Sequence, residues 1–134
     1  MNRSYLFVPA DSERKLKKSA DIGADALILD LEDSVTADAR PAARELTAEY
    51  PQGKENVWVR INPVDSPDWE ADIEAVMPSR PVGIVLPKPH HARDAVKLSD
   101  VNFPIPCYQL GVELEFDDIS PLAALLEEAL AQCR

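Results

Sequence analysis

The chain has 134 residues, of which 46% are hydrophobic, and its 24 acidic and 14 basic residues give a formal net charge of −10. This acidity argues against nucleic acid or an anionic membrane as the main partner, because phosphate binding requires a cationic surface. The composition is that of a folded domain rather than a disordered chain, and no apolar run approaches the roughly 20 residues of a membrane span.

The first half of the chain is predicted as strand, helix, strand, helix. Residues 5–8 and 26–29 are continuously apolar, which is typical of strands covered on both faces of a parallel sheet. Residues 13–20 follow an acidic and a hydroxyl residue suited to an N-cap and end in a basic turn. The second helix covers residues 38–50 and starts just before Pro41, because proline fits only a first turn.

The second half continues the alternation. Pro78 is expected to stop the third helix, and Ser120-Pro121 to open the last one, in which leucines recur on one face. In order, the predicted elements are a strand at 57–61, a helix at 69–77, a strand at 82–86, a short helix at 91–98, a less clear strand at 105–112 and a helix at 120–130.

Strict alternation of strands and helices predicts an α/β fold with a parallel sheet and right-handed crossovers. The sequence contains no low-complexity tract and no second periodic region, so we expect a single domain over residues 1–134. The amino-terminal apolar run is too short for the core of a signal peptide. Two cysteines, Cys107 and Cys133, form neither a disulfide framework nor a metal cluster, so both thiols are expected to be free in a cytoplasmic, reducing compartment.

Polar side chains follow three of the predicted strands at the point where each strand ends. Ligands bind at the carboxyl ends of strands in parallel α/β sheets, so these side chains are expected to share one rim. They are Asp30, Glu32 and Asp33 after the second strand, Arg60 and Asn62 at the third, and Lys88 after the fourth.

Two interpretations of this rim stay open. The two cations could bind a carboxylate or phosphate, and the carboxylates could orient Mg²⁺ directly or through its water ligands. Alternatively, the acidic run is a helix cap or solvated loop and Arg60 belongs to a structural ion pair. Asp30 ends an apolar strand and needs a specific partner there, so we expect Asp30 and Arg60 to face a shared pit.

Other candidate sites are weaker. His90 and His91 lack a third ligand at zinc spacing, and neither cysteine has a basic neighbour in the sequence that would favour a catalytic thiol. Four glycines in the whole chain exclude a glycine-rich phosphate loop.

Five segments resemble, in order and spacing, the citrate lyase β-subunit-like branch of the HpcH/HpaI aldolases, which also contains the malyl-CoA lyases. The resemblance covers roughly residues 3–98, and the segments "DLEDSV", "VRIN" and "LPK" are specific as a set. The matching segments are residues 3–10, 23–35, 39–40, 59–62 and 86–88.

The resemblance implies a (β/α)₈ barrel that makes or breaks a carbon–carbon bond beside a carbonyl. In such a family Mg²⁺ chelates a keto acid such as oxaloacetate or glyoxylate and stabilises an enolate, and many members take an acyl-CoA thioester. By this resemblance Arg60 binds the carboxylate or carbonyl oxygen of the substrate. Asp30, Glu32 and Asp33 support the water shell of the metal, and Lys88 lies at the same rim.

Two further roles follow only from the resemblance. Arg3 corresponds to a position near the CoA phosphates, and Glu113 to the first direct metal ligand at the end of the fifth strand. The second ligand of the family, an aspartate, would fall beyond Arg134.

The chain departs from the family pattern in its length. A complete barrel takes about 250 residues, so the sequence predicts its first half, about five βα units, with residues 99–134 as a divergent tail ending in a helix. We expect a carbon–carbon lyase that assembles as a homo-oligomer. The alternative is a shortened, non-catalytic binding or assembly protein derived from that family.

Overall fold

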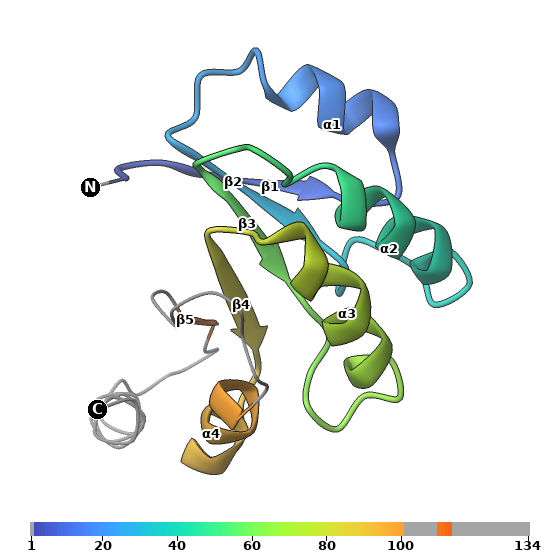
Figure 1. The fold of residues 1–134 in the computed structure, drawn as a ribbon, viewed down its shortest axis with the longest axis vertical. Coiled ribbons are helices and arrows are strands. Elements are labelled where there is room, and N and C mark those ends of the chain that lie inside the picture. Colours follow the sequence, from blue (N-terminus) through green and yellow to red (C-terminus); the bar gives the residue numbers. More distant parts are fainter. Residues whose placement is uncertain (1, 101–109, 114–134) are drawn as a thin grey trace.

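The computed structural model describes residues 2–100 and 110–113, which alternate strand and helix along the chain (Figure 1). The expected helix at 120–130 and the residues 105–109 of the expected fifth strand lie outside the described residues. The elements are β1 Tyr5–Pro9, α1 Glu13–Ser19, β2 Ala26–Asp30, α2 Arg40–Glu49, β3 Val57–Arg60, α3 Trp69–Val76, the 3₁₀ helix η1 Met77–Ser79, β4 Gly83–Pro87, α4 Ala92–Asp100 and β5 Leu110–Glu113.

The five strands form one parallel sheet in the order β1-β2-β3-β4-β5. Each strand therefore pairs with its neighbours in the chain, as in a barrel, and the order never reverses as it does in a doubly wound sheet. The expected fold class, parallel βα repeats like the first half of a (β/α)₈ barrel, is confirmed. The pairing places Asp30 opposite Pro9 on one side and Arg60 on the other, at the carboxyl edge.

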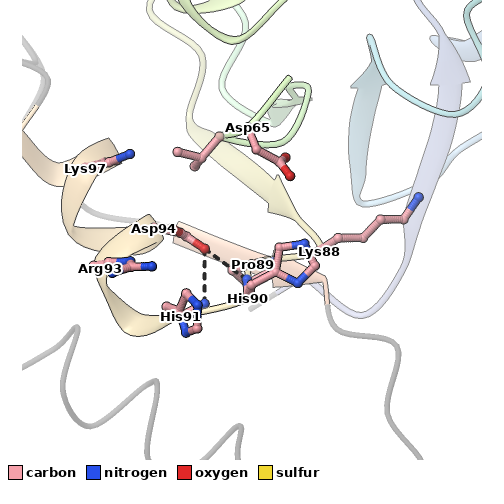
Figure 2. A pocket seen from close by; sticks show the side chains of 9 residues that line it. Asp65, Lys88, Pro89, His90, His91, Arg93, Asp94 and Lys97 are labelled. Carbon is pink, nitrogen blue, oxygen red and sulfur yellow. Dashed lines mark hydrogen bonds between the residues drawn. The ribbon is translucent and has the colours of Figure 1, made fainter. Parts of the chain in front are cut away.

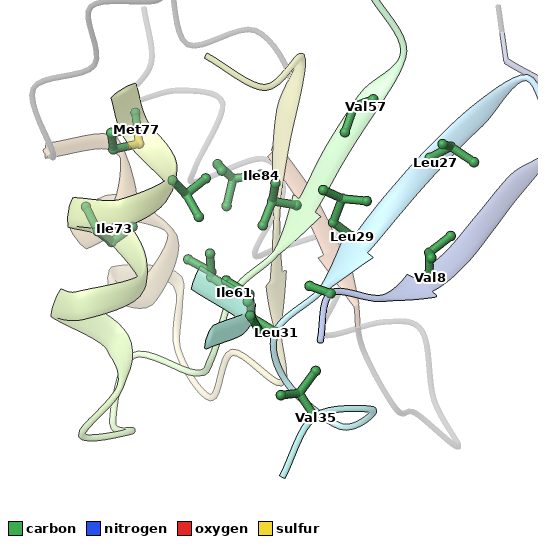
Figure 3. Close-up of a cluster of buried hydrophobic side chains, with 14 of the residues drawn as sticks. Val8, Leu27, Leu29, Leu31, Val35, Val57, Ile61, Ile73, Met77 and Ile84 are labelled. Atoms are coloured by element: carbon green, nitrogen blue, oxygen red, sulfur yellow. The ribbon is translucent and has the colours of Figure 1, made fainter. Parts of the chain in front are cut away.

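The two faces of the sheet carry different side chains, because successive residues of a strand point to opposite sides. One face packs against the helices, with Val8, Leu29, Val59 and Ile84 among the buried residues of the main core (Figure 3). In Figure 1, α1, α2 and α3 lie along this side. Burial of this face orients the strands and thereby fixes which side chains turn the other way.

The opposite face carries a smaller buried cluster that contains Ile28, Trp58 and Val85. Tyr5 and Phe7 lie beside it on β1 and are 48% and 44% exposed. The Tyr5 and Trp58 rings meet edge to face, with centroids 6.0 Å apart. By strand parity this is the face that turns inward in a barrel, and it leads to the carboxyl rim.

The element boundaries follow local chemistry. The Ser12 hydroxyl caps α1 by accepting a hydrogen bond from the backbone N–H of Lys15, and a proline lies in the first turn of α2, as predicted. The α-helix α3 ends at Val76, before Pro78 as the sequence predicted, and the chain continues through Pro78 as the 3₁₀ helix η1. Proline is tolerated there because it lies in the first turn of the 3₁₀ segment, where its missing N–H has no helical partner. Arg80 then ends η1 with a left-handed backbone, φ 52°. Within the described ranges, no helix is long and apolar enough to cross a membrane.

Candidate functional site

Asp30 and Arg60 meet at the carboxyl edge of the sheet as a two-pronged ion pair. Each ends its strand, β2 or β3, and the pairing register sets them side by side. Arg60 Nε donates to Asp30 Oδ1 and Arg60 Nη2 to Asp30 Oδ2, both at 2.8 Å. The residues are 1% and 6% exposed, so the pair is buried. The predicted meeting of these two side chains is confirmed.

The loop after β2 closes over the Asp30 carboxylate. The backbone N–H of Glu32 donates to Oδ1 at 2.9 Å and that of Ser34 to Oδ2 at 3.0 Å. Burial opposes ionisation of Asp30, but the hydrogen bonds from Arg60, Ser34 and Glu32 outweigh it and hold the pKa of this carboxyl below its ordinary value. Asp30 is thus an anion that fixes both the loop and the guanidinium.

Lys88 reaches from the end of β4 to the acidic loop after β2. Its Nζ lies 2.8 Å from Glu32 Oε1 and 3.1 Å from Asp33 Oδ1. The backbone of Lys88 is left-handed, with φ 46°, a conformation that a lysine adopts only where its surroundings favour it. Hydrogen bonds to Glu32 and Asp33 raise the pKa of Lys88, so the ammonium stays charged.

Glu32 is the buried member of the acidic loop, at 5% exposure. Its Oε1 binds Lys88, whereas Oε2 is buried without a hydrogen bond and lies 3.5 Å from Arg60 Nη1. Burial raises the pKa of Glu32, the nearby Asp33 charge adds to the effect, and Lys88 and Arg60 counter it only in part. This oxygen therefore has the capacity to accept a hydrogen bond from a ligand or a metal-bound water.

The Arg60 guanidinium is also held from the inward face of the sheet. Its central carbon lies 4.6 Å from the centroid of the Phe7 ring, within cation–π range. Its Nη1 edge faces Glu32 at 3.5 Å and Asp33 at 4.0 Å. Asp30 and the ring together fix the plane of the guanidinium and turn its Nη1 edge toward the acidic loop.

Two other residues singled out in the sequence, Arg3 and Glu113, are placed differently from the rim residues described above. Arg3 lies at the amino end of β1, where its side chain is 88% exposed and sits 3.7 Å from Asp25, so it is at the opposite edge of the sheet from the rim. Glu113 ends β5 in register with Pro87, which brings its backbone to the rim. The side chain of Glu113 lies outside the described parts of the structure.

A buried aspartate that sequence reasoning missed supports the rim from behind. Asp72 of α3 is 0% exposed, and its Oδ2 accepts from the backbone N–H of Asn62 at 2.8 Å and from its Nδ2 at 2.7 Å. Asn62 Nδ2 also donates to the Leu31 carbonyl at 3.0 Å, and Arg44 Nε donates to Asp72 Oδ1 at 2.8 Å. The signal available in the sequence was an acidic residue beside apolar Ile73 on the buried face of a helix.

Among residues 2–100 and 110–113, no group of three or more His, Cys, Asp or Glu side chains is arranged to hold a metal ion. The acidic loop instead binds Arg60 and Lys88.

The raised pKa of Glu32 sets a measurable pH dependence. A carboxyl with a higher pKa in the folded than in the unfolded protein binds more protons when folded, so its contribution to stability falls as the pH rises above the ordinary value. We expect the free energy of unfolding of Glu32→Gln, relative to the unchanged chain, to rise between about pH 4 and about pH 7. Urea unfolding at both ends of this range measures the difference.

The control for this measurement is Glu45→Gln, which changes an exposed carboxyl on α2. Its effect on the free energy of unfolding is expected to stay within about 0.5 kcal/mol at either pH. A relative stability of Glu32→Gln that decreases with pH would contradict the raised pKa.

Comparison with known proteins places this chain in one family. A family profile described as HpcH/HpaI aldolase/citrate lyase matches residues 3–114. A (3S)-malyl-CoA thioesterase of Cereibacter sphaeroides is 34% identical over 114 residues, 81% of this chain and 39% of the relative. A citrate lyase subunit beta-like protein of Mycobacterium tuberculosis is 37% identical over 95 residues, 71% of this chain and 34% of the relative.

The solved structures give the same result. The citrate lyase beta subunit of M. tuberculosis, complexed with oxaloacetate and magnesium, superposes with a TM-score of 0.77 at 31% identity. The match covers 93% of this chain and 52% of that one. The chain therefore spans about half of the solved relative and less than half of the curated relatives.

Proposed function

Because the chain belongs to the HpcH/HpaI aldolase/citrate lyase family, we propose that its rim grips the substrate of a carbon–carbon lyase. The substrate class is a 2-keto acid or a hydroxyacyl-CoA thioester, cleaved or formed through an enolate. The observation that carries the proposal is the Asp30–Arg60 pair, which fixes a guanidinium at the carboxyl edge of the sheet. A relative named as a (3S)-malyl-CoA thioesterase and one named as a citrate lyase subunit beta-like protein support this substrate class.

Arg60 is the proposed anion clamp. A guanidinium already oriented by Asp30 and by the Phe7 ring presents its charge at the rim without the entropic cost of ordering a mobile side chain. A carboxylate or carbonyl oxygen bound there would be held in one orientation. As negative charge develops on that oxygen, the fixed positive charge stabilises it with little reorganisation.

Lys88 lowers the negative charge that the acidic loop presents to an anionic substrate. Its ammonium neutralises part of the Glu32 and Asp33 charge, which would otherwise repel an approaching keto-acid anion. The left-handed backbone of Lys88 aims the side chain across the rim. We expect Lys88 to position these carboxylates rather than to exchange a proton, because its pKa is raised.

Magnesium is the proposed cofactor, since the solved M. tuberculosis relative holds it together with oxaloacetate. The buried Glu32 Oε2 without a hydrogen bond, next to a half-exposed Asp33, fits a role in holding the water ligands of the ion. Glu113, at the end of β5, is the proposed direct ligand. When bound, Mg²⁺ supplies Lewis-acid polarisation of the substrate carbonyl.

The proposal is tested by titrating oxaloacetate calorimetrically into the chain with Mg²⁺ present. Arg60→Lys keeps the charge but loses the two-pronged geometry, so we expect the affinity to fall by roughly tenfold or more. Arg14→Lys, an exposed change on α1, should bind as the unchanged chain does. Circular dichroism shows whether each variant is folded.

Two results would contradict the proposal. One is an Arg60→Lys affinity equal to that of the unchanged chain. The other is no binding of oxaloacetate by the unchanged, folded chain. The second result, with no cleavage of malyl-CoA or citramalyl-CoA, would favour the alternative of a non-catalytic binding or assembly protein.

A further inference from the structure

The helices that cover the sheet carry charges of opposite sign on their outward sides. In Figure 1, α1, α2 and α3 lie along one side of the sheet. Tyr50, at the end of α2, joins this helix to α1 by donating its hydroxyl to the Leu16 carbonyl at 3.0 Å. The two helices therefore belong to one surface, and the sign of the exposed charge changes between them.

Arg14 and Lys18 form the positive side of α1. The helix buries Leu16 and Ser19, and at 3.6 residues per turn Arg14 and Lys18 fall on the opposite side, one turn apart. Both are exposed, and neither forms an ion pair within residues 2–100 and 110–113. Two like charges four residues apart destabilise a helix slightly, so this pair does not stabilise α1 itself.

Glu45 and Glu49 form the negative side of α2. The helix buries Ala43 and Thr47, so the two glutamates lie on the opposite side, again exposed and one turn apart. Arg44 of the same helix binds carboxylates at α3 instead. Neither glutamate forms an ion pair with another residue that the structure describes. Like the cations of α1, they repel each other within their own helix.

The two charged sides match each other in spacing. Every α-helix rises about 6 Å between residues i and i+4, so the two cations of α1 fit two carboxylates of a helix like α2. Glu70 and Glu74 on α3, also exposed and one turn apart, extend the negative potential beside α2. On a chain with a net charge of −10, the positive side of α1 is a place where a second copy can approach without repulsion.

We propose that α1 of one copy docks against α2 of a second copy in a two-fold symmetric dimer. In a two-fold contact each copy presents α1 to the α2 of the other, so the match between cations and carboxylates occurs twice. Within one chain the two helices lie side by side and both charged sides face outward, so only another copy supplies this match.

The dimer is expected to be weak, because exposed ion pairs contribute little one by one and are screened by salt. The inference does not depend on the proposed function. The helices lie on the side of the sheet that carries the main core, whereas the proposed substrate contacts lie at the carboxyl rim.

Sedimentation equilibrium of the full chain measures the self-association. We expect dimers at about 20 mM salt, and an association constant at least tenfold lower at about 500 mM salt. Arg14→Glu/Lys18→Glu reverses the charge of α1, and Glu45→Lys/Glu49→Lys reverses that of α2. Each is expected to lower the association constant at low salt by roughly tenfold or more. An equimolar mixture of the two variants is expected to recover dimers, because each variant then matches the other on both helices.

The matched control is Arg93→Glu/Lys97→Glu, which reverses two exposed cations one turn apart on α4 and changes the net charge equally (Figure 2). Its association constant is expected to stay within about threefold of that of the unchanged chain. Circular dichroism shows whether each variant is folded, and either reversal can be compared with the control by itself. A chain that is monomeric at every concentration, equal losses in reversal and control, an association constant that the reversals leave unchanged, or a mixture that stays monomeric would each overturn the proposal.

Discussion

Replacing Asp30 by alanine is expected to lower the free energy of unfolding by about 3–5 kcal/mol. The change removes the carboxylate that accepts both prongs of Arg60 and leaves a guanidinium at 6% exposure with its charge less well compensated. It also removes the acceptor for the backbone N–H groups of Glu32 and Ser34, so the loop after β2 loses its anchor. Urea unfolding at neutral pH, followed by circular dichroism, measures the loss.

Two further variants show whether the loss of stability in Asp30→Ala comes from breaking the buried ion pair. Asp30→Leu/Arg60→Met replaces the pair by apolar side chains and is expected to recover the part of the stability that Asp30→Ala loses through the unpaired guanidinium. The part due to the Glu32 and Ser34 N–H groups is not recovered, because leucine offers no acceptor. Asp33→Ala removes a 59% exposed carboxylate of the same loop and is expected to cost no more than about 1 kcal/mol. A loss for Asp30→Ala as small as that for Asp33→Ala would show that the buried pair does not hold the rim together.

The strands and the rim could be predicted because they depend on rules that act locally. Continuous apolar runs such as 26–29 indicate strands covered on both faces, and parallel strands place their carboxyl ends at one edge. The position of Asp30 beside Arg60 at this edge follows from these two rules alone. The sequence left open whether Arg60 is a clamp or a member of an ion pair, and the structure shows the ion pair.

The contacts of Lys88 could not be predicted, because they depend on a backbone conformation that lysine rarely adopts. A residue with φ 46° sends its side chain in a direction that the strand pattern does not indicate. Its partners Glu32 and Asp33 lie more than fifty residues away in the chain. Only the assembled sheet brings them within reach.

The burial of Asp72 behind the rim could not be predicted for a related reason. A charged residue in a short amphipathic helix is ordinarily assigned to the solvent side. Here the residues that satisfy it come from other elements: Asn62 follows β3, ten residues before Asp72, and Arg44 lies on α2, 28 residues before it. Such a residue is recognised by its partners and not by its own position in the helical pattern.

Asp72→Ala is expected to lower the free energy of unfolding by about 3–5 kcal/mol, the range for breaking a buried charged pair. The change leaves the Asn62 N–H and one Nδ2 hydrogen without an acceptor, and the Arg44 guanidinium, whose side chain is 14% exposed, loses the partner of its Nε and keeps Asp68. The matched control is Asp68→Ala, because Asp68 also binds Arg44 but is 21% exposed. We expect the control to lose about 1 kcal/mol.

The effect of Asp72→Ala is also expected at the rim, because Asn62 joins β3 to β2 through the Leu31 carbonyl. Native-state hydrogen exchange measures this for the Leu31 amide, which donates to the Arg60 carbonyl. Exchange should accelerate in Asp72→Ala beyond the amount that Asp68→Ala produces, since only Asp72 binds Asn62. Equal acceleration in both variants would mean that the α2–α3 contacts stabilise the domain as a whole. Selective acceleration of exchange at the Leu31 amide would show that Asp72, in a helix behind the sheet, stabilises the rim around Arg60.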